Sequence, residues 1–338
     1  MPLQRIARLP AVALFAVLAA IGISGGAGTA EAQTQTVVLY SSNNTDTVET
    51  ALDAVRKKTP SLNVQQVTGG TGSLMRRIQA EAQNPRGDLL WSGGFGTLGA
   101  YKSLMEPYKS PDLAAIPAEF RGPDNAWVGT NVHVMVLMVN ERQLKGQAAP
   151  KTWSDLMKPD WKGKFAITDP SKSATAYILV YGLLKQFGRD GLEKLAANAV
   201  ITSSSGSTYK GVAAGEFPVG LTIEYAAQEY VAGGQKEIKL VYPTEGSYLA
   251  PEGMFIVKGA KNAAAARALD DGLLGTETQQ ALLVKNFRRP VRTDISVSKL
   301  TSLPDLASIK VFPLDQQAAS AEYEQLVALW NLAVAKAR

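Results

Sequence analysis

Short apolar runs alternate with helical stretches from residue 36 onward, and this alternation limits the possible folds more than any other feature of the chain. Segment 36–44, TVVLYSSNN, is typical of a buried strand that ends in a polar loop, and 46–60, DTVETALDAVRKKTP, of a helix that Pro60 stops. Segments 62–73, LNVQQVTGGTGS, and 87–94, GDLLWSGG, are typical of further strands. Such strand–helix–strand repeats predict an α/β fold with a parallel sheet covered by helices.

The second half of the chain repeats this design. Segment 127–140, WVGTNVHVMVLMVN, is a long extended apolar run that we expect to carry the chain into a second lobe. Strands, polar loops and helices then alternate over 161–234, and 248–262, YLAPEGMFIVKGAKN, is expected to return to the first lobe. Amphipathic helices are predicted over 266–286 and 320–337, because apolar residues recur there at spacings of three and four.

The N-terminus has the features of a secretory signal peptide. Arg5 and Arg8 precede an apolar run over 11–23, and Ala30-Glu31-Ala32 provides the small residues of a cleavage site. The apolar run is too short to span a membrane stably. We therefore expect export with cleavage near Ala32, which leaves about 300 residues, a length that fits two lobes.

Charge and composition exclude several classes of protein. The chain contains no cysteine, so it has neither a disulfide framework nor a thiolate nucleophile. Its formal net charge is +5, and the basic residues are scattered without interleaved aromatic residues. This pattern argues against nucleic acid as a partner and suits an acidic ligand.

The sequence offers no assembled catalytic or metal site. The one histidine, His133, lies inside an apolar strand, where a packed structural role is expected. One histidine without cysteine cannot form a zinc site of the usual type. The acidic residues show no spacing that would pair them for general acid–base catalysis. We therefore predict no catalytic residues, no bound metal and no cofactor.

The junctions between strands and helices are rich in Gly, Ser, Thr and Asn in both halves of the chain. In open α/β sheets, ligands bind beyond the carboxyl ends of the strands, where these junctions lie. Helix N-termini present unpaired amides and partial positive charge. If two lobes face each other, five or six such junctions converge into a cage for an oxyanion such as phosphate, phosphonate, sulfate or carboxylate.

Several segments together resemble the periplasmic solute-binding proteins of ABC importers, in the ferric-iron-binding-protein-like group. These segments are VVLYSSNN, TGGTGSLMRRIQAEAQNPRGDLLWSGG, WKGKFAITDP, VAAGEFPVGL and APEGMFIVKGAKN, and the resemblance covers nearly all of 36–295. It implies a two-lobed type II periplasmic binding protein, with a mainly parallel sheet flanked by helices in each lobe and a cleft between the lobes. The expected lobes are 33–130 with 251–295, and 131–250 with 296–338. They would close by bending near 129–140 and 248–257.

The group's iron binders hold the metal with a histidine, a glutamate and two adjacent tyrosines. The corresponding positions here carry Asn44, Gly93 and Tyr225 followed by Ala226, so three of the four ligands are missing. A hard trivalent metal requires anionic oxygen ligands. The resemblance therefore favours the group's other members, which are similar receptors for hexose phosphates, phosphoglycerate or 2-aminoethylphosphonate.

The predicted ligand-binding residues are the polar residues at the strand ends together with two aromatic neighbours: Ser41, Ser42, Asn43, Thr71, Gly72, Ser73, Trp91, Ser92, Ser173, Thr175, Ser204, Ser205, Ser207, Glu224 and Tyr225. Two of these have an equally weighted structural alternative. Glu224 accepts hydrogen bonds from the ligand or complements a helix dipole. Trp91 stacks on the ligand or belongs to the core.

These observations predict a monomeric periplasmic receptor that captures a small anionic solute and delivers it to an ABC permease and ATPase in the inner membrane. Four alternatives stay open at this stage. They are a receptor for ferric iron or an iron complex, a polyamine or thiamine receptor, a periplasmic sensor subunit, and a secreted hydrolase on the same two-lobed scaffold.

Overall fold

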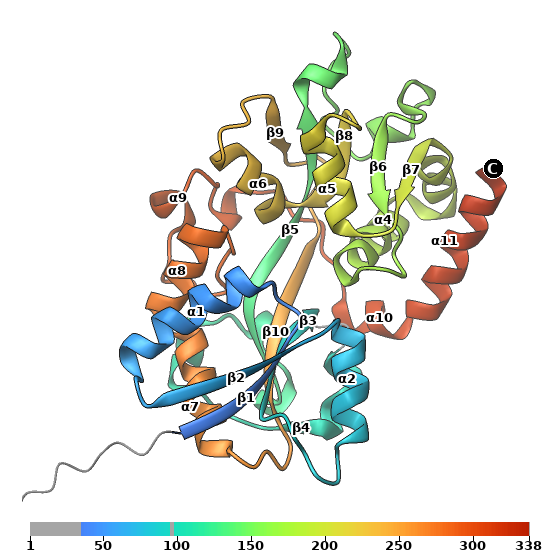
Figure 1. The fold of residues 1–338 in the computed structure, drawn as a ribbon. Helices are drawn as coiled ribbons and strands as arrows, with labels where there is room; N and C mark the ends of the chain where they lie inside the picture. The colour runs from blue at the N-terminus through green and yellow to red at the C-terminus, as the bar shows by residue number, and fades with distance from the viewer. Residues whose placement is uncertain (1–34, 95–97, 338) are drawn as a thin grey trace, which may run out of the picture. The chain divides into compact units, whose positions relative to one another are not determined.

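The computed structural model describes residues 35–94 and 98–337, so the predicted signal peptide, 1–32, lies outside the described residues. The first half begins with β1 (Gln35–Ser41), α1 (Thr45–Lys58), β2 (Leu62–Thr68), α2 (Thr71–Ala80) and β3 (Leu89–Gly94) (Figure 1). The predicted alternation of strands and helices is confirmed. Asn44 caps α1 by accepting a hydrogen bond from the Thr47 amide, and the helix ends at Lys58, shortly before Pro60.

The remaining elements follow the same α/β pattern. The strands are β4 (Met105–Glu106), β5 (Val128–Asn140), β6 (Phe165–Thr168), β7 (Ala199–Thr202), β8 (Val219–Ile223), β9 (Ile238–Val241) and β10 (Leu249–Val257). The helices are α4 (Ala174–Asn198), α5 (Ser205–Ala214), α6 (Glu224–Ala232), α7 (Ala263–Leu274), α8 (Thr276–Asn286), α9 (Val297–Leu300), α10 (Gln316–Ala321) and α11 (Tyr323–Ala337). Short 3₁₀ segments lie at Gly99–Leu104, Pro111–Ala115, Ala118–Phe120, Pro123–Asn125, Glu141–Leu144, Ser154–Met157, Pro159–Trp161 and Leu306–Ser308.

Two parallel groups of strands are joined through an antiparallel pair. In the part of the chain that the structure describes, the strand order is β2-β1-β3-β10-β5-β8-β6-β7, with β4 beside β10 and β9 beside β5. β1 pairs in parallel with β2 and β3, and β6 pairs in parallel with β7 and β8. β10 and β5 run antiparallel to each other between the two groups (Figure 1). The mainly parallel sheets expected from the sequence are thus confirmed.

The two groups of strands have separate hydrophobic cores. One core contains Leu39, Trp91 and Phe255 together with apolar residues of α1, α7 and α8. The other contains Leu137 and Phe165 with apolar residues of α4 and α11. β5 and β10 contribute residues to both cores, as expected of strands that cross between two lobes. The lobe boundaries predicted above remain a prediction.

Backbone conformation divides α4 into two helical pieces. Gly188, at φ 66°, has a left-handed conformation that interrupts the helix. Across residues 35–94 and 98–337, the helices all fall short of the length and apolar character needed to cross a membrane.

Candidate functional site

Three hydroxyl groups meet where β1, β3 and α2 come together. Oγ of Ser92 lies 2.5 Å from Oγ of Ser42 and 2.8 Å from Oγ1 of Thr71, and the Thr71 and Ser42 oxygens are 3.2 Å apart. Ser92 is buried, Thr71 is half-buried and Ser42 is exposed. Parallel strands end at the same edge of a sheet, and this brings residues 42 and 92 together. We call Ser42, Thr71 and Ser92 the hydroxyl triangle.

The N-terminus of α2 lies beside this triangle and has no side-chain cap. Its N-cap residue is Gly70, which offers no acceptor atom, and no acidic residue occupies the first turn. The amides of Ser73 and Leu74 bond to the backbone carbonyl of Gly70. The helices α1, α4 and α5 differ from α2, because the side chains of Asn44, Ser173 and Ser204 cap them. The start of α2 therefore has the features of an anion seat, with first-turn amides and the positive end of the helix dipole.

A second group of hydroxyls lies at the start of α4 and α5. Oγ of Ser173 is 2.9 Å from Oγ1 of Thr175 and 2.8 Å from Oγ of Ser205. Oγ of Ser204 accepts a hydrogen bond from the Ser207 amide and lies 2.8 Å from Oγ of Ser207. Cα atoms of α4 come within 8 Å of those of β3, the strand that carries Ser92 in the first group.

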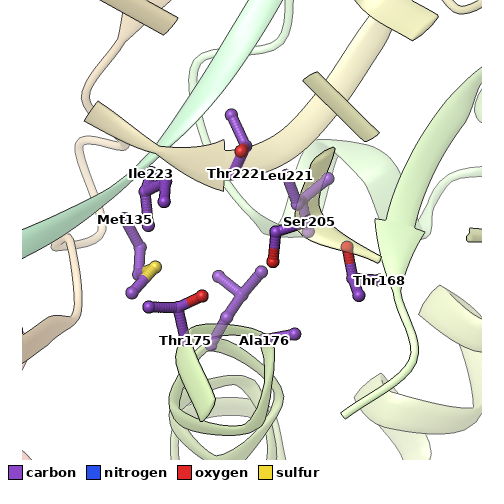
Figure 2. A pocket seen from close by; sticks show the side chains of 9 residues that line it. Met135, Thr168, Thr175, Ala176, Ser205, Leu221, Thr222 and Ile223 are labelled. Atoms are coloured by element: carbon purple, nitrogen blue, oxygen red, sulfur yellow. The ribbon is translucent and has the colours of Figure 1, made fainter. Parts of the chain in front are cut away.

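A small cavity lies behind these hydroxyls. Thr175 and Ser205 line it together with Thr222, Met135 and Ile223, and its volume is about 10 Å³ (Figure 2). That volume corresponds to a single water molecule, so the cavity by itself is too small for an organic solute.

A larger hollow of about 820 Å³ lies on another side of the sheet, and none of the predicted site residues lines it. Leu249 and Pro251 of β10 line this hollow, whereas Glu252, the next residue, hydrogen-bonds with Asn131 of β5. Successive side chains of a strand point to opposite faces. The hollow and the polar groups around Glu252 are therefore separated by the sheet.

Two predicted ligand residues, Ser41 and Trp91, lie in the interior. Oγ of Ser41 donates to the Trp91 carbonyl oxygen at 2.9 Å and accepts from the Asn43 amide. The Trp91 indole is fully buried and donates to Thr130 Oγ1 at 3.0 Å. These contacts fix the two strand ends from within, and for Trp91 they favour the core alternative.

Glu224 is engaged by protein groups. Arg289 donates to its carboxylate through Nε at 3.1 Å and Nη2 at 2.6 Å, and the Tyr242 hydroxyl donates at 2.7 Å. Glu224 and Arg289 are both buried. Because both carboxylate oxygens already accept hydrogen bonds, the geometry favours the structural alternative for Glu224.

A buried polar cluster lies where β5, β10 and α6 meet, and the sequence did not reveal it. Arg288 donates from Nη1 to Nε2 of His133 at 2.8 Å, and its guanidinium carbon lies 3.8 Å from the centre of the Tyr225 ring. Asn131 donates to Glu252 at 2.6 Å. We call Arg288, His133, Glu252, Asn131 and Tyr225 the junction cluster.

Burial sets the protonation of this cluster. Desolvation, with a smaller contribution from Arg288, holds the pKa of His133 well below its usual range. The imidazole is therefore neutral, and because Nε2 accepts from Arg288, Nδ1 carries the proton. Burial raises the pKa of Glu252, although Arg288, Asn43 and Asn131 oppose this shift.

The model of the family of bacterial extracellular solute-binding proteins matches residues 87–317. This chain belongs to that family. The solute-binding protein is 26% identical over 323 residues to the Fe(3+)-binding periplasmic protein of Serratia marcescens, covering 91% of this chain and 93% of the relative. It is 28% identical over 261 residues to a putative 2-aminoethylphosphonate-binding periplasmic protein of Salmonella typhimurium, covering 73% of this chain and 74% of the relative.

A solved structure shares the fold of this solute-binding protein. The periplasmic binding protein AfuA from Actinobacillus pleuropneumoniae, with exogenous fructose-6-phosphate bound, matches with a TM-score of 0.77 and 25% identity, covering 89% of this chain and 98% of that one. The type II periplasmic binding protein fold predicted from the sequence is confirmed. Proteins of this family bind solutes and work with an ABC permease and ATPase.

The positions that the resemblance aligned with iron ligands have other contacts in this solute-binding protein. Asn44 caps α1, and the Tyr225 ring lies under the Arg288 guanidinium. Among residues 35–94 and 98–337, no group of three or more His, Asp or Glu side chains is arranged to hold a metal ion.

From the sequence, Arg288 and Arg289 belong to the scattered basic residues, and His133 is expected to be a packed side chain. One signal could have indicated the junction cluster: Glu252 is a carboxylate inside an apolar strand, LAPEGMFIV. A charged residue in such a run is buried only with polar partners.

Proposed function

We propose that this protein is the receptor of an ABC importer for a small solute that carries a phosphonate or phosphate group. The observation that carries the proposal is the hydroxyl triangle beside the uncapped N-terminus of α2. Hydroxyls and first-turn amides together bind the oxygens of a tetrahedral anion, which accept several hydrogen bonds at once. The names of two relatives, which cite aminoethylphosphonate and fructose 6-phosphate, agree with this chemistry.

Capture would proceed by closure of the lobes. The solute first binds the hydroxyl triangle, and the hydroxyls of Ser173, Thr175 and Ser205 then approach from the other lobe. β5 and β10 are the connections that must bend, because both hydrophobic cores include their residues. The closed form presents the surface that the permease recognises.

A thermal-shift and calorimetric screen tests the proposal. The purified protein is tested against 2-aminoethylphosphonate, fructose 6-phosphate, phosphoglycerate, inorganic phosphate, a polyamine, thiamine and ferric citrate. A ligand at a hundredfold excess over its Kd stabilises the native state by about 2.7 kcal/mol, which gives a clear rise in Tm. We expect this rise with an organophosphorus compound.

A matched pair of variants locates the site. Thr71→Val removes one hydroxyl of the triangle and keeps the shape of the side chain, and Thr36→Val makes the same change at the opposite end of β1. We expect Thr71→Val to weaken binding about tenfold, while Thr36→Val does not. A response to ferric citrate alone, or equal affinity in both variants, would contradict the proposal.

A further inference from the structure

Arg288 is a buried arginine without an ion pair. Its exposed fraction is 4%, and no carboxylate of the described residues lies within 4.0 Å of its nitrogens. The next two arginines differ, because Arg289 pairs with Glu224 and Arg292 with both Asp112 and Asp294. Glu252 and Glu229 lie near enough for Arg288 to lower the pKa of each, but neither contacts it directly. Burying a guanidinium without a carboxylate in contact is costly, so the arrangement calls for an explanation.

The partners that Arg288 does have are uncharged. It donates to the neutral His133 ring and lies on the face of Tyr225. The carboxylate of Glu252 lies 3.9 Å from His133 Nε2, the same nitrogen that accepts the hydrogen bond from Arg288. Nε of Arg288 is buried and has no hydrogen-bond partner in the described chain. One donor of a fixed positive charge is thus unused.

Two neighbouring amides are also incompletely bonded. Oδ1 of Asn131 and Nδ2 of Asn43 are buried without hydrogen-bond partners among the described residues, although each side chain lies close enough to Glu252 to lower its pKa. Both residues are more than nine-tenths buried. Buried polar atoms are nearly always paired, so several unpaired atoms around one centre indicate a missing ligand or ordered water.

This cluster adjoins the hydroxyl triangle. In the sheet, Glu252 lies opposite both Asn131 of β5 and Gly94 of β3, two residues beyond Ser92. Asn43, which approaches Glu252, directly follows Ser42. Tyr225 on α6 is partly exposed, so this group of buried polar residues reaches the surface there.

We propose that Arg288 is the charged anchor of the binding site, donating through Nε and Nη2 to the anionic group of the solute, while Nη1 stays bonded to His133. This inference rests on the proposed function and narrows it: the solute must carry a formal negative charge, as a phosphonate or phosphate does. The hydroxyl triangle supplies neutral hydrogen bonds to adjoining oxygens. Solutes that are neutral or only cationic, such as a free sugar or a polyamine, leave Arg288 unpaired and are rejected.

The test compares Arg288→Gln with Arg267→Gln. Arg267 is an exposed arginine whose guanidinium lies 5.7 Å from the Tyr108 ring, so its replacement removes the same charge and a similar aromatic contact away from the cluster. Calorimetry measures Kd for 2-aminoethylphosphonate, fructose 6-phosphate, phosphoglycerate and inorganic phosphate, and Tm is measured without ligand. We expect R288Q to weaken binding ~30-fold, with an unchanged or higher Tm, and R267Q to match the wild type.

The possible outcomes separate this inference from the function on which it rests. If the wild type binds none of the four anions, the proposed function and the anchor are both overturned. If the wild type binds and R288Q binds with the same Kd, only the anchor is overturned. An R288Q protein that fails to fold, or loses several degrees of Tm while keeping its affinity, assigns Arg288 to the fold and also overturns the anchor. Retention of part of the affinity in Arg288→Lys would support it.

Discussion

Nη2 of Arg289 lies 2.6 Å from Oε1 of Glu224, and the side chains are 1% and 2% exposed. Removing one member of such a buried pair leaves the other charge uncompensated. We expect Glu224→Gln to lower the free energy of unfolding by about 3–5 kcal/mol, as measured by chemical denaturation.

An exposed ion pair provides the control for this variant. Lys194 and Asp190 are 2.7 Å apart with exposed fractions of 57% and 81%, and Asp190→Asn should change stability by less than ~0.5 kcal/mol. If Glu224→Gln reduced solute affinity while leaving stability unchanged, Glu224 would be a ligand residue after all.

Asp270 and Asp271 on α7 should respond in opposite ways to the same substitution. Asp270 is 3% exposed, its Oδ1 has no partner in the described chain, and burial raises its pKa well above the usual range. The folded state therefore retains its proton to higher pH than the unfolded state does, so stability falls as pH rises from about 4 toward the folded pKa. Asp270→Asn should stabilise the protein by about 1–2 kcal/mol at pH 7.5, with the gain vanishing below pH ~4.

The neighbouring carboxylate is fully bonded. Asp271 accepts hydrogen bonds from Tyr108 at 2.8 Å and Ser110 at 2.6 Å. Asp271→Asn should lower the free energy of unfolding by about 1–3 kcal/mol at pH 7.5. Urea denaturation of both variants across this pH range tests the pair, and equal effects of the two substitutions would refute the argument.

His133 should make the protein sensitive to mild acid. Its pKa is lowered in the folded state, so the unfolded state binds a proton that the folded state does not, and stability falls as pH drops below about 6.5. Glu252, whose pKa is raised, contributes the opposite slope. His133→Gln retains an acceptor for Arg288 and removes the titration.

Thermal melts between pH 5 and 7.5 measure this effect. We expect the wild type to lose more Tm than His133→Gln over that interval. Parallel pH profiles for the two proteins would show that His133 does not set the acid sensitivity.

Ser92 tests the hydroxyl triangle itself. Ser92→Ala removes the shared partner of Ser42 and Thr71, which still lie 3.2 Å apart and can bond to each other. The free energy of unfolding of the unliganded protein should therefore change by less than ~1 kcal/mol, while affinity for the organophosphorus solute falls about tenfold. Calorimetry with Ser103→Ala, at an exposed serine, serves as the control, and a wild-type Kd for Ser92→Ala would rule out the triangle as the anion seat.

Much of the fold followed from local patterns. Apolar runs that alternate with amphipathic helices predicted the parallel groups β2-β1-β3 and β8-β6-β7, and the runs over 127–140 and 248–262 predicted the strands that join them. Gly, Ser and Thr at the strand ends predicted where hydroxyls would gather, because parallel strands of one sheet end at a common edge.

The individual roles at those strand ends did not follow from the same patterns. Ser41 and Ser42 are adjacent and chemically identical, yet Ser41 is buried against Trp91 and Ser42 is exposed in the triangle. Adjacent strand residues point to opposite faces, and which face lies inside depends on the neighbouring elements.

The sequence by itself determined the α/β class, the crossing strands and the polar character of the strand ends, because those properties depend on spacing and residue type within short segments. Only the tertiary structure decided which buried charged side chains are paired with one another. It paired Arg289 with Glu224, 65 positions away, and placed Arg288 against His133, 155 positions away, without a carboxylate partner in the described chain. Whether a buried charge is paired depends on contacts between distant segments, and no local pattern encodes them.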